Sequence, residues 1–89
     1  MSEFQFSTAP TALDYCRRIV NAMVRLFDID REEAIGRVNR QWRNARFETD
    51  DEVHTLTHET SEFWANDIYY GPDSRWWTAD AHPRPRHYP

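Results

Sequence analysis

The stretch DEVHTLTHETSEFWANDIYYG, residues 51–71, decides the fold, because it carries a long helical pattern rich in large aromatic side chains. At about 100° per residue its apolar side chains gather on one broad side, which we expect to be buried. We therefore predict a helix over residues 51–71 with one buried face and one polar face. The buried face comprises Val53, Leu56, Thr60, Phe63, Trp64 and Ile68, and the opposite face comprises His54, His58, Glu62, Ala65 and Tyr69.

Both ends of this helix carry their own signals. Asp50 or Asp51 is expected to cap the start, since a short carboxylate accepts a hydrogen bond from a free backbone N–H. Gly71 is expected to end the helix in the left-handed conformation, and Pro72 cannot continue it. Because β-branched threonines restrict χ1 in a helix, a break near Thr57 with a restart beyond it is the main alternative.

Two further helices are expected before this stretch, over residues 8–28 and 30–44. The first is expected to begin at a Thr8 or a Thr11 cap, and the second at Asp30, which is followed three residues later by a glutamate. The apolar residues of the first helix form two adjoining stripes, too wide for one neighbour, so this helix should lie centrally or contact another copy. The stripes are Leu13, Cys16, Val20, Met23 and Phe27, and Ala12, Tyr15, Ile19, Ala22 and Leu26.

The fold class expected from these patterns is all-α: a small three-helix domain that spans the whole 89-residue chain, with residues 8–71 as its helical core. Residues 1–7 form a short N-terminal arm, either laid on the body or frayed. Residues 72–89 form an aromatic, proline-containing C-terminal tail, which we expect to pack at least through Trp76 and Trp77.

Composition narrows the function classes. The net charge of -4 gives no general case for nucleic-acid binding. All eleven basic residues are arginine, for which we favour codon bias over dedicated recognition of carboxylates or phosphates. Cys16 is the only cysteine, so an internal disulfide is excluded. Its place in an apolar stripe indicates a buried small hydrophobe rather than a nucleophile.

The expected location follows from the apolar runs. None approaches the roughly 20 residues that a membrane span needs. The N-terminal sequence MSEFQFSTAP lacks the basic start and apolar core of a signal peptide. We expect a cytoplasmic protein that does not associate with membranes.

Charge divides sharply along the chain. Residues 31–46 contain five arginines and two glutamates, whereas residues 47–74 contain eight acids and no arginine. We expect the second and third helices to be antiparallel neighbours whose flanks form ion pairs with each other. The alternative is a basic face for a nucleic acid or an acidic partner, which would make the chain a small nucleic-acid-associated regulator. That basic face would consist of Arg37, Arg40, Arg43 and Arg46.

The polar face of the third helix carries residue types that bind metal ions. His54, His58 and Glu62 are spaced i, i+4 and i+8, which stacks two imidazoles and a carboxylate on one helical face. However, Glu62 stands where the zincin motif HExxH has its second histidine, so a protease is not supported. We expect a solvated polar face at these residues and no cofactor.

The aromatic residues of the C-terminal half are the best candidates for recognition, because tyrosine and tryptophan dominate binding hot spots. The alternative is that Trp76 and Trp77 fold back to complete a small core. The candidate partner-binding residues are Trp64, Tyr69, Tyr70, Trp76 and Trp77.

The function expected from these features is a small non-enzymatic protein-interaction module, an adaptor or an inhibitor of a basic partner whose identity the sequence does not reveal. No serine–histidine–acid spacing and no glycine-rich phosphate loop is present in the sequence. We also expect a homodimer through the first helix, because a core of this size is marginal and dimerisation is a common remedy.

Overall fold

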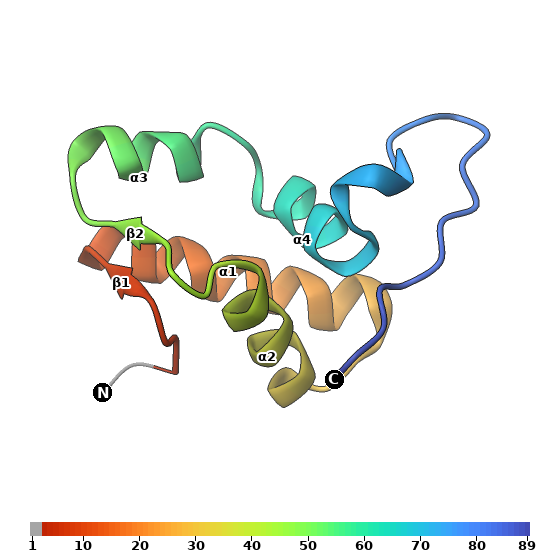
Figure 1. The fold of residues 1–89 in the computed structure, drawn as a ribbon, viewed down its shortest axis with the longest axis horizontal. Helices are drawn as coiled ribbons and strands as arrows, with labels where there is room; N and C mark the ends of the chain where they lie inside the picture. The colour runs from red at the N-terminus through yellow and green to blue at the C-terminus, as the bar shows by residue number, and fades with distance from the viewer. Residues whose placement is uncertain (1–2) are drawn as a thin grey trace.

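A computed structural model describes residues 3–89 of the chain (Figure 1). Figure 1 shows one long helix, α1, with α2 on one side and with α3 and α4 following each other along the other side. The C-terminal tail leaves α4, makes a wide loop and returns towards α2. The elements are β1 (Ser7–Thr8), α1 (Pro10–Phe27), α2 (Arg31–Gln41), β2 (Arg46–Phe47), α3 (Asp50–Thr57), α4 (Ser61–Tyr70) and the 3₁₀ turn η1 (Pro72–Ser74).

The α1 helix forms the centre of the domain. A central position was one of the two explanations offered for its wide apolar surface. Pro10 is its first residue, where a missing N–H breaks no intrahelical hydrogen bond. The predicted threonine caps are wrong: Ala9 is the N-cap without a side-chain bond, because Thr8 is extended in β1. The helix ends at Phe27, where Asp28 adopts the left-handed conformation with a φ of 54°. Buried residues of both stripes face the core, among them Ala12, Cys16, Ile19, Val20, Ala22 and Met23.

Both stripes of α1 are covered by α2, α3 and α4 of the same chain. Leu26 is the exception, with 43% of its surface exposed. The tryptophans of the tail do not cover the second stripe, because Trp76 packs against Phe63 of α4. The homodimer through α1 stays a prediction, which sedimentation equilibrium at micromolar concentration would test.

Residues 3–89 contain four α-helices where three were expected, because the predicted third helix is broken after Thr57. The alternative of a break near that residue is therefore confirmed. Thr60 is extended, with φ of -73° and ψ of 160°, and its hydroxyl accepts a hydrogen bond from the Phe63 N–H at 3.0 Å. At the break the Tyr15 hydroxyl donates to the Glu59 carbonyl, which joins the connection to α1.

The break also changes which residues of α4 are buried. Ala65 was expected on the polar face, but it is fully buried, since the helical phase starts again at Thr60. The predicted caps of α3 need a similar correction. Thr49, not Asp50 or Asp51, is the N-cap, and it shares a capping box with Glu52.

The N-terminal arm is laid on the body rather than frayed over its described part. Phe4 and Phe6 are buried. β1 pairs in parallel with β2, and the Ala9 N–H continues this pairing to the Phe47 carbonyl at 2.7 Å. Asn39 of α2 holds the arm by accepting from the Gln5 N–H at 2.8 Å and donating to the Glu3 carbonyl at 3.2 Å.

The expected ion pairing between the second and third helices is wrong. In the structure of residues 3–89, no salt bridge joins α2 to α3 or α4. The α2 helix ends at Gln41 instead of residue 44, and β2 then leads the chain away before α3 begins. The arginines of α2 find their partners elsewhere, as described below. None of the helices within residues 3–89 has the length and apolar composition that a membrane crossing needs.

Candidate functional site

The candidate site lies where α4 ends and the chain turns back on itself. Gly71 closes α4 by donating its N–H to the Asp67 carbonyl at 2.8 Å. Its φ of 93° is a conformation that glycine adopts without steric cost. Pro72 then begins η1, and Arg75 continues the turn with a left-handed φ of 53°. This sharp reversal brings Trp76 back against α4.

The two adjacent tryptophans of the tail have different environments. Trp76 donates its indole N–H to Asp67 Oδ1 at 3.3 Å, and its ring lies 5.4 Å from that of Phe63. Trp77 is turned by 86° relative to Trp76, and 57% of its surface is exposed. Of the two tryptophans, Trp76 therefore anchors the tail as expected, whereas Trp77 presents a large aromatic surface to solvent.

An apolar pocket with a volume of about 510 Å³ opens beside Trp77. The Trp64 ring in its wall is held by an indole N–H bond to the Leu56 carbonyl at 2.7 Å. The Phe63 and Trp64 rings meet edge to face at 81°. Walls held in this way are suited to binding, because little order has to be gained when a ligand arrives. We call this the Trp77 pocket; it is lined by Phe63, Trp64, Asp67, Pro72 and Trp77.

Asp67 is the one ionisable group that lines the Trp77 pocket. Only 9% of the residue is exposed. Within residues 3–89 its side chain accepts one hydrogen bond, from Trp76, and takes part in no ion pair. Asp67 was not among the site residues predicted from the sequence. The sequence feature that could have indicated burial of Asp67 is its position one helical turn after Phe63 and directly before the apolar Ile68.

Tyr69 and Tyr70, predicted together with the tryptophans as partner-binding residues, lie elsewhere. Tyr69 stacks on Phe27 at the end of α1 with a centroid distance of 3.9 Å and an interplanar angle of 5°. Tyr70 meets the same Phe27 ring edge-on at 5.4 Å. The predicted group of five aromatic residues thus divides into an α1 contact and the Trp77 side.

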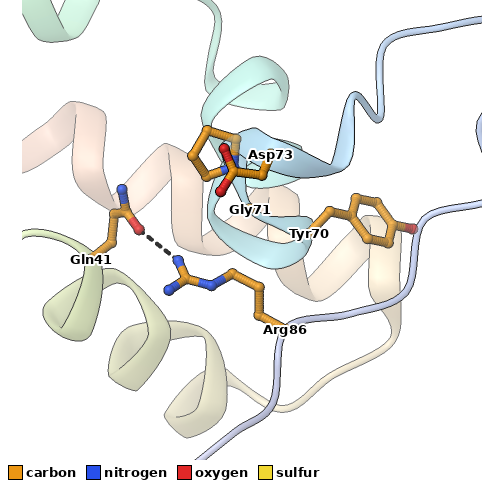
Figure 2. A pocket seen from close by; sticks show the side chains of 6 residues that line it. Gln41, Tyr70, Gly71, Asp73 and Arg86 are labelled. Carbon is orange, nitrogen blue, oxygen red and sulfur yellow. Dashed lines mark hydrogen bonds between the residues drawn. The ribbon is translucent and has the colours of Figure 1, made fainter.

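A second, more polar pocket of about 470 Å³ lies at the other side of the turn (Figure 2). Arg86 of the tail reaches into it and donates from Nη1 to Gln41 Oε1 at 2.9 Å. Figure 2 shows the guanidinium of Arg86 directed towards α2, away from the Tyr70 ring. The lining residues are Gln41, Tyr70, Gly71, Pro72, Asp73 and Arg86.

The last part of the tail is docked on α2, which the sequence analysis did not anticipate. We call residues 86–88 the C-terminal segment. The Arg86 N–H donates to the Tyr69 carbonyl at 2.8 Å. Arg37 donates to the Arg86 carbonyl at 2.9 Å, and Arg40 donates to the His87 carbonyl at 2.6 Å. Two arginines of α2 therefore bind the backbone of the tail.

Both glycines of the chain lie beneath this segment. A Cβ at Gly36 would lie 2.7 Å from Tyr88 Cζ and closer still to the hydroxyl oxygen. A Cβ at Gly71 would lie 3.0 Å from Arg86 Cδ. The ring of Tyr88 therefore lies against the glycine inside α2.

The arginines predicted as a basic face do not form one continuous charged surface. Arg37 is 5% exposed and pairs with Glu33 at 2.8 Å. Burial lowers the pKa of Arg40, and the nearby charges of Arg86 and Arg37 lower it further. Its guanidinium and that of Arg37 also lie over the Tyr88 ring, at 5.4 and 5.2 Å. Arg43 and Arg46 are exposed, and Arg46 pairs with Glu48 at 3.0 Å.

The predicted metal ligands are divided between two helices. His54 and His58 are exposed with ring centroids 5.7 Å apart, the first inside α3 and the second directly after it. Glu62 lies beyond the break in α4, where it accepts from the Ser61 hydroxyl at 2.6 Å and approaches Arg25 at 3.9 Å. Within residues 3–89 no group of three or more histidine, cysteine or acidic side chains is arranged to hold a metal ion.

The single cysteine is buried, as expected. Cys16 has no exposed surface, and burial raises the pKa of its thiol to about 12. At neutral pH it is a neutral thiol inside the core, which is not the state that attacks an electrophile.

Comparison of the chain with protein-family models, with curated proteins and with solved structures finds no match. The functional assignment therefore rests on the contacts of the chain itself. Among them, the Trp77 pocket combines an exposed tryptophan, fixed aromatic walls and a nearly buried carboxylate.

Proposed function

We propose that the chain is a non-enzymatic protein-interaction module of the cytoplasm, an adaptor or an inhibitor, which binds a partner protein through the Trp77 pocket. The observation that supports this is the exposure of Trp77, at 57%, beside an apolar pocket of about 510 Å³. A tryptophan costs little conformational entropy when it is buried at an interface, and tryptophans are enriched among binding hot spots.

The neighbourhood of Trp77 supports the same function. Phe63 and Pro72 extend its apolar surface, and the ring of Trp64 behind them is fixed by hydrogen bonding. Interface centres combine buried aromatic residues with a polar rim, and the polar residues around this turn supply such a rim. The tail docks on α2 through Arg86 and His87, and Trp77 stays exposed. Trp77 is therefore available to a partner.

The test compares affinity capture with three versions of the full chain: wild type, Trp77→Ala and Leu26→Ala. Leu26 is the matched control, since it is the other large hydrophobic residue that is strongly exposed among residues 3–89 and it does not line the pocket. Proteins retained from the cytoplasm of the source cell are quantified by mass spectrometry.

We expect at least one retained protein to be lost with Trp77→Ala and kept with Leu26→Ala. Once that partner is purified, Trp77→Ala should weaken its binding by about 30-fold, which corresponds to a hot-spot loss of about 2 kcal/mol. Equal capture by all three chains would contradict the proposal.

A further inference from the structure

The Trp77 pocket has the chemistry of a site for a cation. Phe63, Trp64 and Trp77 supply three aromatic rings around one opening. Neighbouring rings in this region stand nearly perpendicular to each other, at 81° for Phe63 and Trp64 and at 86° for Trp76 and Trp77. Rings set at a large angle to each other have faces that point in different directions. Ring faces attract cations through the negative potential of the π system.

The carboxylate of Asp67 makes this preference stronger. Asp67 lines the pocket with 9% of its surface exposed, and among the described residues it has no cationic partner. Its hydrogen bond from Trp76 is long, at 3.3 Å. A negative charge at the edge of an apolar pocket attracts a cation more strongly than the same charge in open water, because the surrounding dielectric is lower. A cation that enters the pocket would therefore be favoured beside Asp67.

The charge of the surrounding chain points the same way. Residues 47–74, which include α3, α4 and the turn after them, contain eight acids and no arginine. Glu62 and Asp73 lie on either side of Asp67 in this part of the sequence. An acidic neighbourhood attracts a positively charged partner and disfavours an acidic one.

We propose that the Trp77 pocket receives an arginine side chain of the partner protein, with its guanidinium against the Asp67 carboxylate and its plane against the aromatic rings. This inference rests on the proposed function and names the chemistry of the partner. Arginine fits better than lysine, because the guanidinium is planar, is weakly hydrated and stacks on aromatic faces. It also binds a carboxylate through two parallel N–H bonds.

The test uses three short peptides, acetyl-Gly-X-Gly-amide, in which X is arginine, lysine or citrulline. Citrulline has the shape of arginine without its charge. Each peptide is titrated into the full chain, and binding is followed by the NMR shifts of the indole N–H groups of Trp64 and Trp77. We expect the arginine peptide to bind at least about tenfold more tightly than the citrulline peptide, with lysine between them.

Two pocket variants and one control locate the effect. Asp67→Asn should remove the preference for arginine over citrulline, whereas Asp73→Asn, which removes one exposed charge from the adjacent turn, should leave it in place. Because Asp67→Asn also alters the bond to Trp76 and could disturb folding, Trp77→Ala provides a second variant at an exposed position, and it should abolish binding of the arginine peptide.

The inference is overturned if citrulline or lysine binds as tightly as arginine. It is also overturned if Trp77→Ala still binds the arginine peptide, or if a folded Asp67→Asn chain keeps the preference. Failure here and failure of the proposed function are distinguishable. If partner capture depends on Trp77 but the arginine peptide does not bind, only the inference is refuted. Arginine binding combined with capture that is indifferent to Trp77 removes the proposed protein-interaction function.

Discussion

Replacing Gly36 by alanine should destabilise the wild-type chain, although alanine is the better helix former. In an unobstructed helix interior this change stabilises by about 1 kcal/mol. Here the added Cβ would lie 2.7 Å from Tyr88 Cζ, so the ring must be displaced. The C-terminal segment then loses its contacts with α2. If Tyr88 is first replaced by alanine, the obstruction is gone and the effect of the glycine substitution should change sign.

The magnitude follows from the contacts of the C-terminal segment. Arg37 and Arg40 each donate a charge-assisted hydrogen bond to it, and the Arg86 N–H donates one to Tyr69. With the stacking on Tyr88, these contacts contribute roughly 6 kcal/mol. Ordering three residues costs roughly 4 kcal/mol, which leaves a net stabilisation of about 2 kcal/mol. Gly36→Ala should therefore cost the wild-type chain about 1 kcal/mol after its gain in helix propensity.

The measurement is a double-mutant cycle by urea denaturation. Gly36→Ala should lower the free energy of unfolding by about 1 kcal/mol in the wild-type chain and raise it by about 1 kcal/mol in the Tyr88→Ala chain. The coupling of about 2 kcal/mol is of the size found between residues in contact. A parallel cycle of Gly36→Ala with Trp77→Ala is the control and should show no coupling. The same effect of Gly36→Ala in both the wild-type and the Tyr88→Ala chain would refute this account of the docked segment.

Four further outcomes are expected. At pH 8 the thiol of Cys16, whose pKa burial raises to about 12, should react with a disulfide reagent only as fast as the chain opens; rapid labelling of the folded chain would show that the core is accessible. Thr49→Ala should cost about 1 kcal/mol in urea denaturation, because it removes the cap of α3. The backbone N–H groups of Thr49 and Glu48 hold the pKa of Glu52 below its usual value. Ionised Glu52 therefore stabilises the folded chain at a pH above its usual pKa, and this stabilisation is lost as the pH falls through the lowered pKa. Glu52→Gln should reduce the loss of stability in acid, and an unchanged dependence of stability on pH would count against the capping box. Zinc should leave the melting temperature nearly unchanged, and a large rise that disappears in His58→Ala would establish the metal site after all.

The helices were predictable to the extent that their signals are local. Asp30 caps α2 through the Glu33 N–H at 2.7 Å, and Gly71 ends α4, as the sequence indicated. The conformation of Gly71 differs from the expected left-handed helical one, because its φ of 93° is combined with a ψ of 149°. The break in the third predicted helix was foreseen only as an alternative. A threonine such as Thr60 fits both a helix interior and a cap, and its hydrogen bond to Phe63 decides between them only in the folded chain.

The docking of the tail could not be predicted from the sequence. The prolines before Arg86 indicate an extended chain, but they do not indicate where it binds. The decisive contact joins residues that are 49 positions apart, Arg37 and Arg86. The ion pairs expected between α2 and α3 failed for the same reason, because α2 uses its arginines on this distant segment.

The candidate site was predictable in its residue types but not in its grouping. The five aromatic residues were expected to act together, yet Tyr69 stacks against Phe27 while Trp77 faces solvent. Asp67 was not predicted at all, because a single aspartate in a helix has many harmless explanations. Its importance becomes visible only when the turn at Gly71 brings the tryptophans back to α4.

The α2 helix is held from outside by both ends of the chain. Asn39 binds the N-terminal arm, and Arg37 and Arg40 bind the C-terminal segment. Removal of residues 3–6 or of residues 86–88 would therefore loosen a helix in the middle of the sequence. Amide hydrogens of α2 should then exchange with solvent faster as one cooperative unit, while those at the centre of α1 keep their protection. A tag attached at either end carries the same risk to α2.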